Sequence, residues 1–413
     1  MTNSQLMKLD LIQASAIDKL SRLRAGALFM KMGTGKTKVA MDWISQRINR
    51  DSDVVIWIAP ASLLNDQNYR DEMAKWCDFM PNIRTFSVES ISMSDEKFME
   101  MLNLADSARS FCIIDESIKI KNLDAKRTRR LIKHYDHFDF RLILNGTPTT
   151  RSILDLLPQI NFISPNILNM TEAQFANYFM EYYKDGYRAW RRWSKPANEA
   201  ALVETIRPYI FDADLDIPVE MCTTDIECQM NGQERDNYQS AKDESLRGLF
   251  INFLEISQKL QHTYTVCDDK YRKLMDIVGD EQLIIFVKYL DEIDCLLELL
   301  PSAAEYSGRH KANLADFEAG RYQVLICTYG TGAFGLNLQF CHRMAFLTQT
   351  FDYKDKIQAM HRIYRTGQTK NVEIYDFFVD VGLERIIRSS LDKKERTLDN
   401  IIKCIKDGCY ECL

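Results

Sequence analysis

The chain of 413 residues lacks several features that mark specialised classes of protein. No apolar run approaches the roughly 18–20 residues that a membrane-spanning helix needs. The N-terminus lacks the basic start and apolar stretch of a secretory signal. The eleven cysteines are scattered through apolar segments and form no short loop-rich frame, which predicts reduced thiols and a cytoplasmic location. No short-period repeat is visible, so a solenoid is not expected.

The chain also lacks a net positive charge and carries −6 at pH 7. That sum does not indicate nucleic-acid binding, but phosphates are neutralised on one face of a protein, so local charge matters more. Two stretches are strongly basic, 119–133 and 188–195. Most basic helix faces are simply solvated. The second stretch, however, mixes arginines with two tryptophans, which suits a sugar-phosphate backbone. We therefore expect contacts with nucleic acid at Lys119, Arg191 and Arg192.

Three thiols lie close together near the C-terminus, at Cys404, Cys409 and Cys412. This spacing could supply three ligands of a zinc site. No fourth ligand lies nearby in the sequence, so a reduced tail at the end of an amphipathic helix is the preferred interpretation.

The sequence contains one pattern twice. Short apolar runs alternate with amphipathic helical stretches from 25 to 148 and again from 282 to 378. Runs that are apolar throughout are typical of parallel strands buried on both faces, with helices as crossovers. The stretch between the halves predicts helices and no strong strands. A chain of this length exceeds one hydrophobic core. We predict an α/β fold with a first domain at 1–154, a helical protrusion and linker at 155–215, and a second domain at 216–413.

A glycine-rich loop, MGTGKT, follows the first apolar run and opens a helical stretch. Its two glycines would let backbone N–H groups point at a phosphate, where a helix N-terminus adds positive charge. The lysine would span the β- and γ-phosphates, and the threonine hydroxyl would coordinate Mg²⁺. The predicted nucleotide contacts in this loop are Gly33, Thr34, Gly35, Lys36 and Thr37.

Two carboxylates, Asp115 and Glu116, end the apolar run FCIID, so both are expected at the carboxyl edge of the sheet, where ligands bind. Asp115 would hold Mg²⁺ directly or through water. Glu116 would orient the attacking water and accept its proton. Upstream, Gln13 is a candidate for adenine recognition, because a carboxamide can both donate to and accept from the edge of a base.

The second half contributes two arginines in QAMHRIYRTGQ. Arg362 and Arg365 are three residues apart and would share one face of a helix or its end. We expect them to reach the γ-phosphate across a cleft and to stabilise the charge that builds during transfer. Hydrolysis would then require the two domains to close on the nucleotide.

Six motifs stand in one order: MGTGKT, IAPASLL, IIDESIKIKN, LNGTPTTRS, TYGTGAFGLNL and QAMHRIYRTGQ. Their order and wording resemble superfamily-2 helicase-type motors and, within them, the Swi/Snf-type translocases of double-stranded DNA. The resemblance extends from about Gln13 to Phe378. It implies two RecA-like P-loop NTPase domains in tandem with a helical insertion lobe, and ATP and Mg²⁺ as cofactors. It also implies that duplex or branched DNA is held mainly through its phosphates, by a monomer or weak oligomer.

The resemblance also implies roles for residues outside the phosphate loop and the Asp115–Glu116 pair. Gly335 and Gln358 would contribute to the nucleotide site. Gly146, Thr147 and Asn337 would link hydrolysis to the grip on DNA.

The chain departs from the family pattern at several positions. Ser117 and Ile118 replace the Ala-His of the Asp-Glu box, so a histidine that usually couples the two domains is missing. The chain also differs from the family pattern at Met30 and Lys31, before the phosphate loop. Further differences are Thr149, Thr150 and Arg151 at the end of the LNGTPTTRS motif, and Asp212 to Asp214 in the link between the halves.

The sequence thus predicts an ATP hydrolase that moves along duplex or branched DNA and remodels or migrates branches. The chain has no room for histone-tail modules, so we expect a bacterial or phage enzyme, associated with the nucleoid or active in an infected cell. A strand-separating DNA or RNA helicase is the first alternative, because a strand-splitting wedge has no dependable signature. The second is a nucleic-acid-binding protein whose ATP site acts only as a switch.

Overall fold

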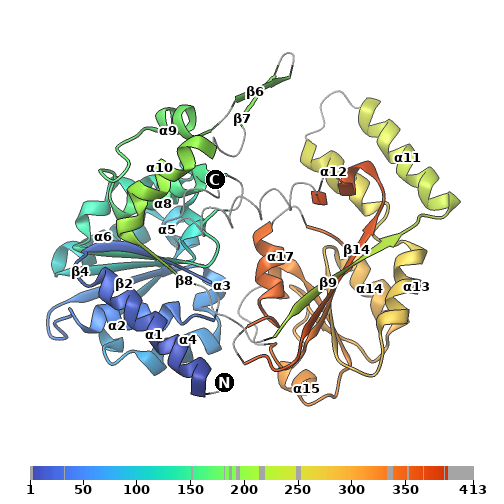
Figure 1. Cartoon of the computed structure of the whole chain (residues 1–413), viewed down its shortest axis with the longest axis horizontal. Helices are drawn as coiled ribbons and strands as arrows, with labels where there is room; N and C mark the ends of the chain where they lie inside the picture. Colours follow the sequence, from blue (N-terminus) through green and yellow to red (C-terminus); the bar gives the residue numbers. More distant parts are fainter. Residues whose placement is uncertain are drawn as a thin grey trace. The chain divides into compact units, whose positions relative to one another are not determined.

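The computed structural model (Figure 1) describes the chain apart from short gaps and the C-terminal tail. It divides into two compact units, the first running to Asp216 and the second starting at Ile217. The described residues are 3–31, 33–149, 152–180, 182–185, 188–191, 196–213, 219–247, 253–332, 338–350, 353–365, 367–385 and 387–388.

The first unit contains a six-stranded sheet, with all strands parallel, in the order β3-β2-β4-β5-β1-β8. Four of these strands are the apolar runs that the sequence predicted. The strands are β1 (Ala25–Met30), β2 (Val54–Ala59), β3 (Ile83–Ser87), β4 (Ser110–Asp115), β5 (Phe140–Asn145) and β8 (Ile210–Ala213).

Helices cover both faces of this sheet, which explains why its central strands β2, β4, β5 and β1 are buried along most of their length. In β1, Leu28 and Met30 pack into one buried cluster with residues of α1, α2 and α4, whereas Ala27 and Phe29 pack into the other with residues of α5 to α10. The bounds are α1 (Asn3–Leu20), α2 (Lys36–Ser45), α3 (Ala61–Leu64), α4 (Gln67–Trp76), α5 (Val88–Met93), α6 (Asp95–Ser107), α7 (Lys126–Lys133), α8 (Leu156–Ile163), α9 (Glu172–Phe179) and α10 (Pro196–Ile206).

The segment 155–215, for which the sequence predicted helices and no strong strands, contains short strands of four residues each. The short strand β8 pairs with β1 in parallel, with Ala213 opposite Met30. Two further strands, β6 (Tyr182–Asp185) and β7 (Arg188–Arg191), form a separate antiparallel hairpin that follows α9 (Figure 1). The helices of this segment pack on the first sheet, because α8, α9 and α10 share its buried cluster. Short strands near prolines give little periodic signal.

The second unit has another six-stranded parallel sheet, in the order β11-β12-β10-β13-β14-β9. The predicted apolar runs form β10, β12, β13 and β14. The edge strand β9 was missed, because its sequence MCTTDIEC is polar and mostly exposed. The strands are β9 (Met221–Cys228), β10 (Leu283–Val287), β11 (Ala304–Tyr306), β12 (Val324–Thr328), β13 (Arg343–Phe346) and β14 (Val372–Val379).

The helices α11 to α17 belong to the second unit. Phe317 of α15 and Ala359 of α17 pack in the cluster that also holds Ile284 and Phe286 of β10. The helices are α11 (Gly232–Arg247), α12 (Phe253–His262), α13 (Asp268–Ile277), α14 (Leu290–Leu299), α15 (Leu314–Glu318), α16 (Tyr329–Gly332) and α17 (Tyr353–Met360).

Within the described part of the chain, no helix combines the length and apolar character needed to cross a membrane. The same residues hold no group of three or more side chains suited to bind a metal ion by themselves. The thiols considered for zinc, Cys404, Cys409 and Cys412, lie outside the described residues.

Candidate nucleotide site

The glycine-rich loop connects β1 to α2, as the sequence predicted. Gly33 and Gly35 have φ angles of 83° and 80°, in the left-handed region that favours glycine. A Cβ atom at Gly35 would also lie 2.3 Å from Nε2 of Gln13. Glycine is therefore needed at position 35 for its backbone and for its neighbour. The turn directs the first N–H groups of α2 into the loop, where an anion can bind.

Lys36, the first residue of α2, reaches back across the loop. Its Nζ donates hydrogen bonds to the carbonyl oxygens of Met30, at 2.8 Å, and Lys31, at 3.2 Å. The buried Thr34 donates from Oγ1 to the same Lys31 oxygen at 2.6 Å. A phosphate oxygen carries more negative charge than a carbonyl and would be the stronger acceptor for this ammonium group.

Gln13 lies on α1 against this loop. Its side chain is buried, with Nε2 donating to the Thr34 carbonyl at 3.3 Å and Oε1 accepting from Lys38 Nζ at 2.5 Å. The carboxamide therefore ties α1 to the phosphate loop. One N–H and one lone pair are left for a base, and adenine recognition stays a prediction.

Asp115 ends β4 at the carboxyl edge of the sheet and is buried. Its Oδ2 accepts a hydrogen bond of 2.6 Å from the Tyr69 hydroxyl, and its Oδ1 accepts one of 2.9 Å from the Glu116 N–H. Burial, together with the charge of Glu116, raises the pKa of Asp115 to about 6, although Tyr69 and the charge of Lys36 oppose the rise. Lys36, after β1, and Asp115, at the end of β4, both lie at the carboxyl edge of the same parallel sheet.

Glu116 has an unusual backbone, with φ 54° and ψ 52°. Among the described residues only Glu116 and Asn169 combine a side chain with positive φ. This conformation costs a non-glycine residue about 1–2 kcal/mol and is retained mainly where the surroundings require it. Here it starts the short helical turn Ser117–Ile120 directly after β4 and places Glu116 beside Asp115.

The donor set suits a magnesium-bound nucleotide. The Thr37 hydroxyl and the Asp115 carboxylate are hard oxygen ligands of the kind that Mg²⁺ prefers, and they accompany a lysine and a helix N-terminus suited to phosphates.

A buried polar network lies directly behind the two carboxylates. Ser117, Asn145 and Gln159 are at most 1% exposed. The Ser117 hydroxyl donates to Gln159 Oε1 at 2.7 Å, and Asn145 Nδ2 donates to both side chains at 3.3 Å. Gln159 Nε2 donates to the carbonyls of Pro148 and Asp155, each at 2.7 Å.

This network joins the Asp-Glu box to the LNGTPTTRS motif, where Asn145 Oδ1 also accepts the Thr147 N–H at 3.0 Å. Gly146 lies between them in the same turn. The sequence predicted roles for Gly146 and Thr147 but assigned none to Gln159, which lies on α8.

In the second unit, Gln358 and Arg362 are buried, at 3% and 6% exposure. The helix α17 ends at Met360, so Arg362 and Arg365 lie in the turn beyond it, which agrees with a helix end. Among the described residues, Oε1 of Gln358 has no hydrogen-bond partner. Gly335 and Asn337 lie outside the described residues, and their roles stay predictions.

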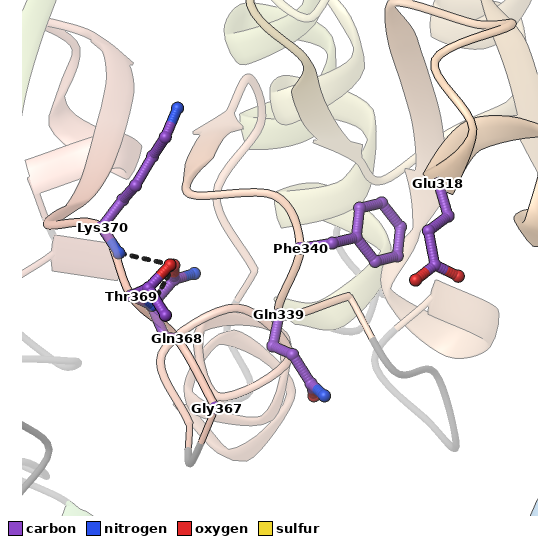
Figure 2. Close-up of a pocket in the computed structure, with 7 residues that line it drawn as sticks. All are labelled: Glu318, Gln339, Phe340, Gly367, Gln368, Thr369 and Lys370. Atoms are coloured by element: carbon purple, nitrogen blue, oxygen red, sulfur yellow. Dashed lines mark hydrogen bonds between the residues drawn. The ribbon is translucent and has the colours of Figure 1, made fainter. Parts of the chain in front are cut away.

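The Gln368 side chain holds the end of this motif together. Its Nε2 donates to the carbonyls of Cys341 and Ile363. Its Oε1 accepts the N–H groups of Thr369 at 2.9 Å and Lys370 at 3.0 Å (Figure 2). With all these bonds inside the fold, Gln368 acts as a structural residue.

A shallow pocket of about 290 Å³ lies beside Gln368, near the amino ends of β13 and β14 (Figure 2). Lys370 on its rim pairs with Glu281 at 3.1 Å. Ligands of parallel sheets bind at the carboxyl edge, and none of the predicted site residues lines this pocket. Its lining is Glu318, Gln339, Phe340, Gly367, Gln368, Thr369 and Lys370.

Several side chains of the basic stretch 119–133 are already paired with other groups of this protein. Lys126 and Arg130 of α7 both pair with Asp95, and Arg127 Nε donates to the carbonyl of Lys119 at 2.7 Å. In the second basic stretch, Arg191 ends β7 and Arg192 lies outside the described residues. Their contacts with nucleic acid stay predictions.

A phosphate loop and an Asp-Glu pair at the carboxyl edge of one parallel sheet define a P-loop nucleoside triphosphatase fold, and the second unit repeats the sheet. The SNF2-related domain matches residues 17–276, and the helicase conserved C-terminal domain matches residues 269–367. The chain therefore belongs to the SNF2-related family and has two RecA-like domains in tandem.

Relatives of the chain come from eukaryotes and bacteria. It is 22% identical to the SWI/SNF chromatin-remodeling complex subunit snf22 of Schizosaccharomyces pombe, over 94% of this chain and 27% of the relative. It is 21% identical to an uncharacterized ATP-dependent helicase of Mycoplasma genitalium, over 97% of this chain and 43% of the relative. The chain thus spans less than half the length of these curated relatives.

Among solved structures, the SWI2/SNF2 ATPase core of Sulfolobus solfataricus in complex with dsDNA matches 98% of this chain. The match covers 94% of that chain, with 16% identity and a TM-score of 0.40.

Proposed function

We propose that this protein hydrolyses ATP and uses the energy to move along duplex or branched DNA. The observation that carries the ATPase is the position of Lys36 and the Asp115–Glu116 pair at the same carboxyl edge of the first sheet. Membership of the SNF2-related family supports the same assignment.

Each residue has a distinct role in the proposed reaction. Lys36 would bind the β- and γ-phosphates, and Thr37 and Asp115 would hold the metal. Bound Mg²⁺ neutralises charge on the phosphates. Glu116 would orient the attacking water and take its proton. Arg362 and Arg365 would stabilise the charge that develops on the γ-phosphate.

The DNA part of the proposal rests on the family and on local charge. One relative is named as a subunit of a chromatin-remodeling complex and another as an ATP-dependent helicase. Lys119, Arg191 and Arg192 would contact the sugar-phosphate backbone, which positions a protein without reading the sequence. We further propose that the protein works in the cytoplasm as a monomer or weak oligomer.

A strand-separating helicase is the second candidate. The observation in its favour is the β6–β7 hairpin, which pairs with no other described strand and carries the basic and aromatic sequence YYKD…RAWR. A helicase of this kind would hydrolyse ATP at the same proposed nucleotide site.

The test is the steady-state ATPase rate without nucleic acid and with single-stranded DNA, duplex DNA, a four-way junction or RNA. Stimulation by duplex or junction DNA supports the translocase. Stimulation mainly by single strands or RNA favours the helicase. A basal rate that no nucleic acid raises would remove the DNA part of the proposal. No ATPase activity above that of Lys36→Ala under any condition would remove all of it.

A further inference from the structure

Tyr69 of α4 connects the candidate magnesium ligand to the neighbouring strand β2. Its hydroxyl donates to Asp115 Oδ2 at 2.6 Å and accepts from Trp57 Nε1 at 2.9 Å. An indole N–H can only donate, and an ionised carboxylate can only accept. The hydroxyl proton of Tyr69 must therefore point at Asp115, and the chain of hydrogen bonds runs from Trp57 through Tyr69 to the carboxylate.

The two oxygens of Asp115 are held by groups from different elements. Tyr69 on α4 holds Oδ2, and the N–H of Glu116, in the turn after β4, holds Oδ1. Rotation of the carboxylate would break at least one of these bonds. Each oxygen still has a lone pair free for a metal or a metal-bound water.

The position of Tyr69 is itself fixed by packing. Trp57 is fully buried in the cluster beneath α2 and α4, and the partly buried Tyr69 packs against that cluster. A tyrosine so placed costs little additional ordering when a ligand binds. Carboxylates that bind metals are commonly oriented in this way by a partner one layer behind them.

We propose that Tyr69 is a positioning residue for the magnesium site, which uses its hydroxyl, backed by Trp57, to orient Asp115 toward the metal. The inference rests on the proposed nucleotide function. It adds a residue from outside the six sequence motifs, five positions after IAPASLL.

The test compares nucleotide affinity with and without metal. A non-hydrolysable ATP analogue is titrated into the full-length protein by calorimetry, once in excess Mg²⁺ and once in EDTA. Tyr69→Phe keeps the ring and removes the hydroxyl. We expect its affinity in EDTA to match the unmodified protein within twofold, because the phosphate loop is unchanged. The gain in affinity that Mg²⁺ provides should fall by about tenfold or more.

Two variants calibrate this result. Asp115→Asn removes the proposed ligand and sets the lower limit of the gain. Tyr135→Phe removes a hydroxyl on the other side of the same sheet and should leave both affinities unchanged. The indole N–H resonance of Trp57, followed by ¹⁵N NMR, should shift in Tyr69→Phe because the indole loses its acceptor.

An unchanged magnesium gain in Tyr69→Phe would overturn the inference, and so would an unshifted Trp57 resonance. If the unmodified protein bound the analogue in neither condition, the proposed function would fail and the inference with it. The two failures are therefore distinguishable.

Discussion

Ser117 and Gln159 form a 2.7 Å hydrogen bond in the interior of the first unit, although they come from the turn after β4 and from α8. The bond is one of several that Gln159 makes: its Oε1 also accepts from Asn145, and its Nε2 binds two carbonyls. The side-chain amide of Gln159 thus makes all the hydrogen bonds of which it is capable. Such networks hold their members in one arrangement, because a partly satisfied buried network is costly.

The first prediction is that Gln159→Leu destabilises the first unit by about 2–4 kcal/mol. It removes the hydrogen bonds that Gln159 accepts from Ser117 and Asn145 and those that it donates to the carbonyls of Pro148 and Asp155. A buried polar group that loses its hydrogen bond costs about 1–3 kcal/mol before relaxation. Ser117→Ala should cost less than about 1 kcal/mol, because Gln159 Oε1 keeps its bond with Asn145. Urea unfolding measures both. Equal losses in the two variants would show that Gln159 is not the centre of the network.

The second prediction separates the roles of the two halves of the proposed site. Glu116→Gln should abolish ATP hydrolysis and retain ATP binding, because it removes the base and keeps the shape. Arg365→Ala should also leave binding nearly intact while reducing turnover by about 10³-fold or more, the effect typical of an arginine that stabilises the transition state. Binding is measured by calorimetry and turnover by phosphate release. Normal turnover in Arg365→Ala would contradict a mechanism that uses both domains.

Local sequence was sufficient to predict that Asp115 and Glu116 follow a buried strand and that the glycine-rich loop connects a strand to a helix. In such motifs the glycines, Lys36 and Thr37 lie within a few residues, so their chemistry can be read from spacing alone. The same holds for the buried strands, whose unbroken apolar runs reflect helices on both faces.

Tyr69 and Gln159 could not be predicted in this way. Their partners lie 46 and 42 residues away, at Asp115 and Ser117, and only the strand order of the sheet brings them together. The strand β8 was not predicted for a related reason. Its four residues form a strand by pairing with β1, which lies far away at the other end of the first unit's sequence.

The third prediction concerns Glu199 of α10, which is 4% exposed. Burial raises its pKa to about 7, from 4.5. The folded state thus holds this proton more tightly than the unfolded state does. The raised pKa of Glu199 therefore stabilises the folded state fully below about pH 4.5, and this stabilisation is lost as the pH rises through about 7. Glu199→Gln removes the penalty and should stabilise the protein at pH 8 by at most about 3 kcal/mol.

The control for Glu199 is Glu204→Gln, an exposed glutamate on the same helix. Thermal unfolding at pH 5 and pH 8 should show that Glu199→Gln gains stability mainly at pH 8 and that Glu204→Gln gains at neither pH. A gain that did not depend on pH would contradict a buried, titrating Glu199.

The fourth prediction concerns Lys270 of α13 in the second unit, which is 0% exposed. Its charge lowers the pKa of two buried carboxylates, Glu292 and Glu384, whose burial otherwise raises it. Lys270→Met leaves these carboxylates without that cation. Removing one partner of a buried ion pair costs about 3–5 kcal/mol, and we take this as the upper limit for the loss of stability in Lys270→Met.

The matched control is Lys259→Met, which breaks an exposed ion pair with Glu244 and should cost less than about 1 kcal/mol. The deficit of Lys270→Met should shrink as the pH falls, because protonation of Glu292 and Glu384 removes the uncompensated charge. Unfolding monitored at pH 5 and pH 8 checks both points. A deficit equal at the two pH values would mean that Lys270 stabilises this unit through packing of its aliphatic stem and not through its charge.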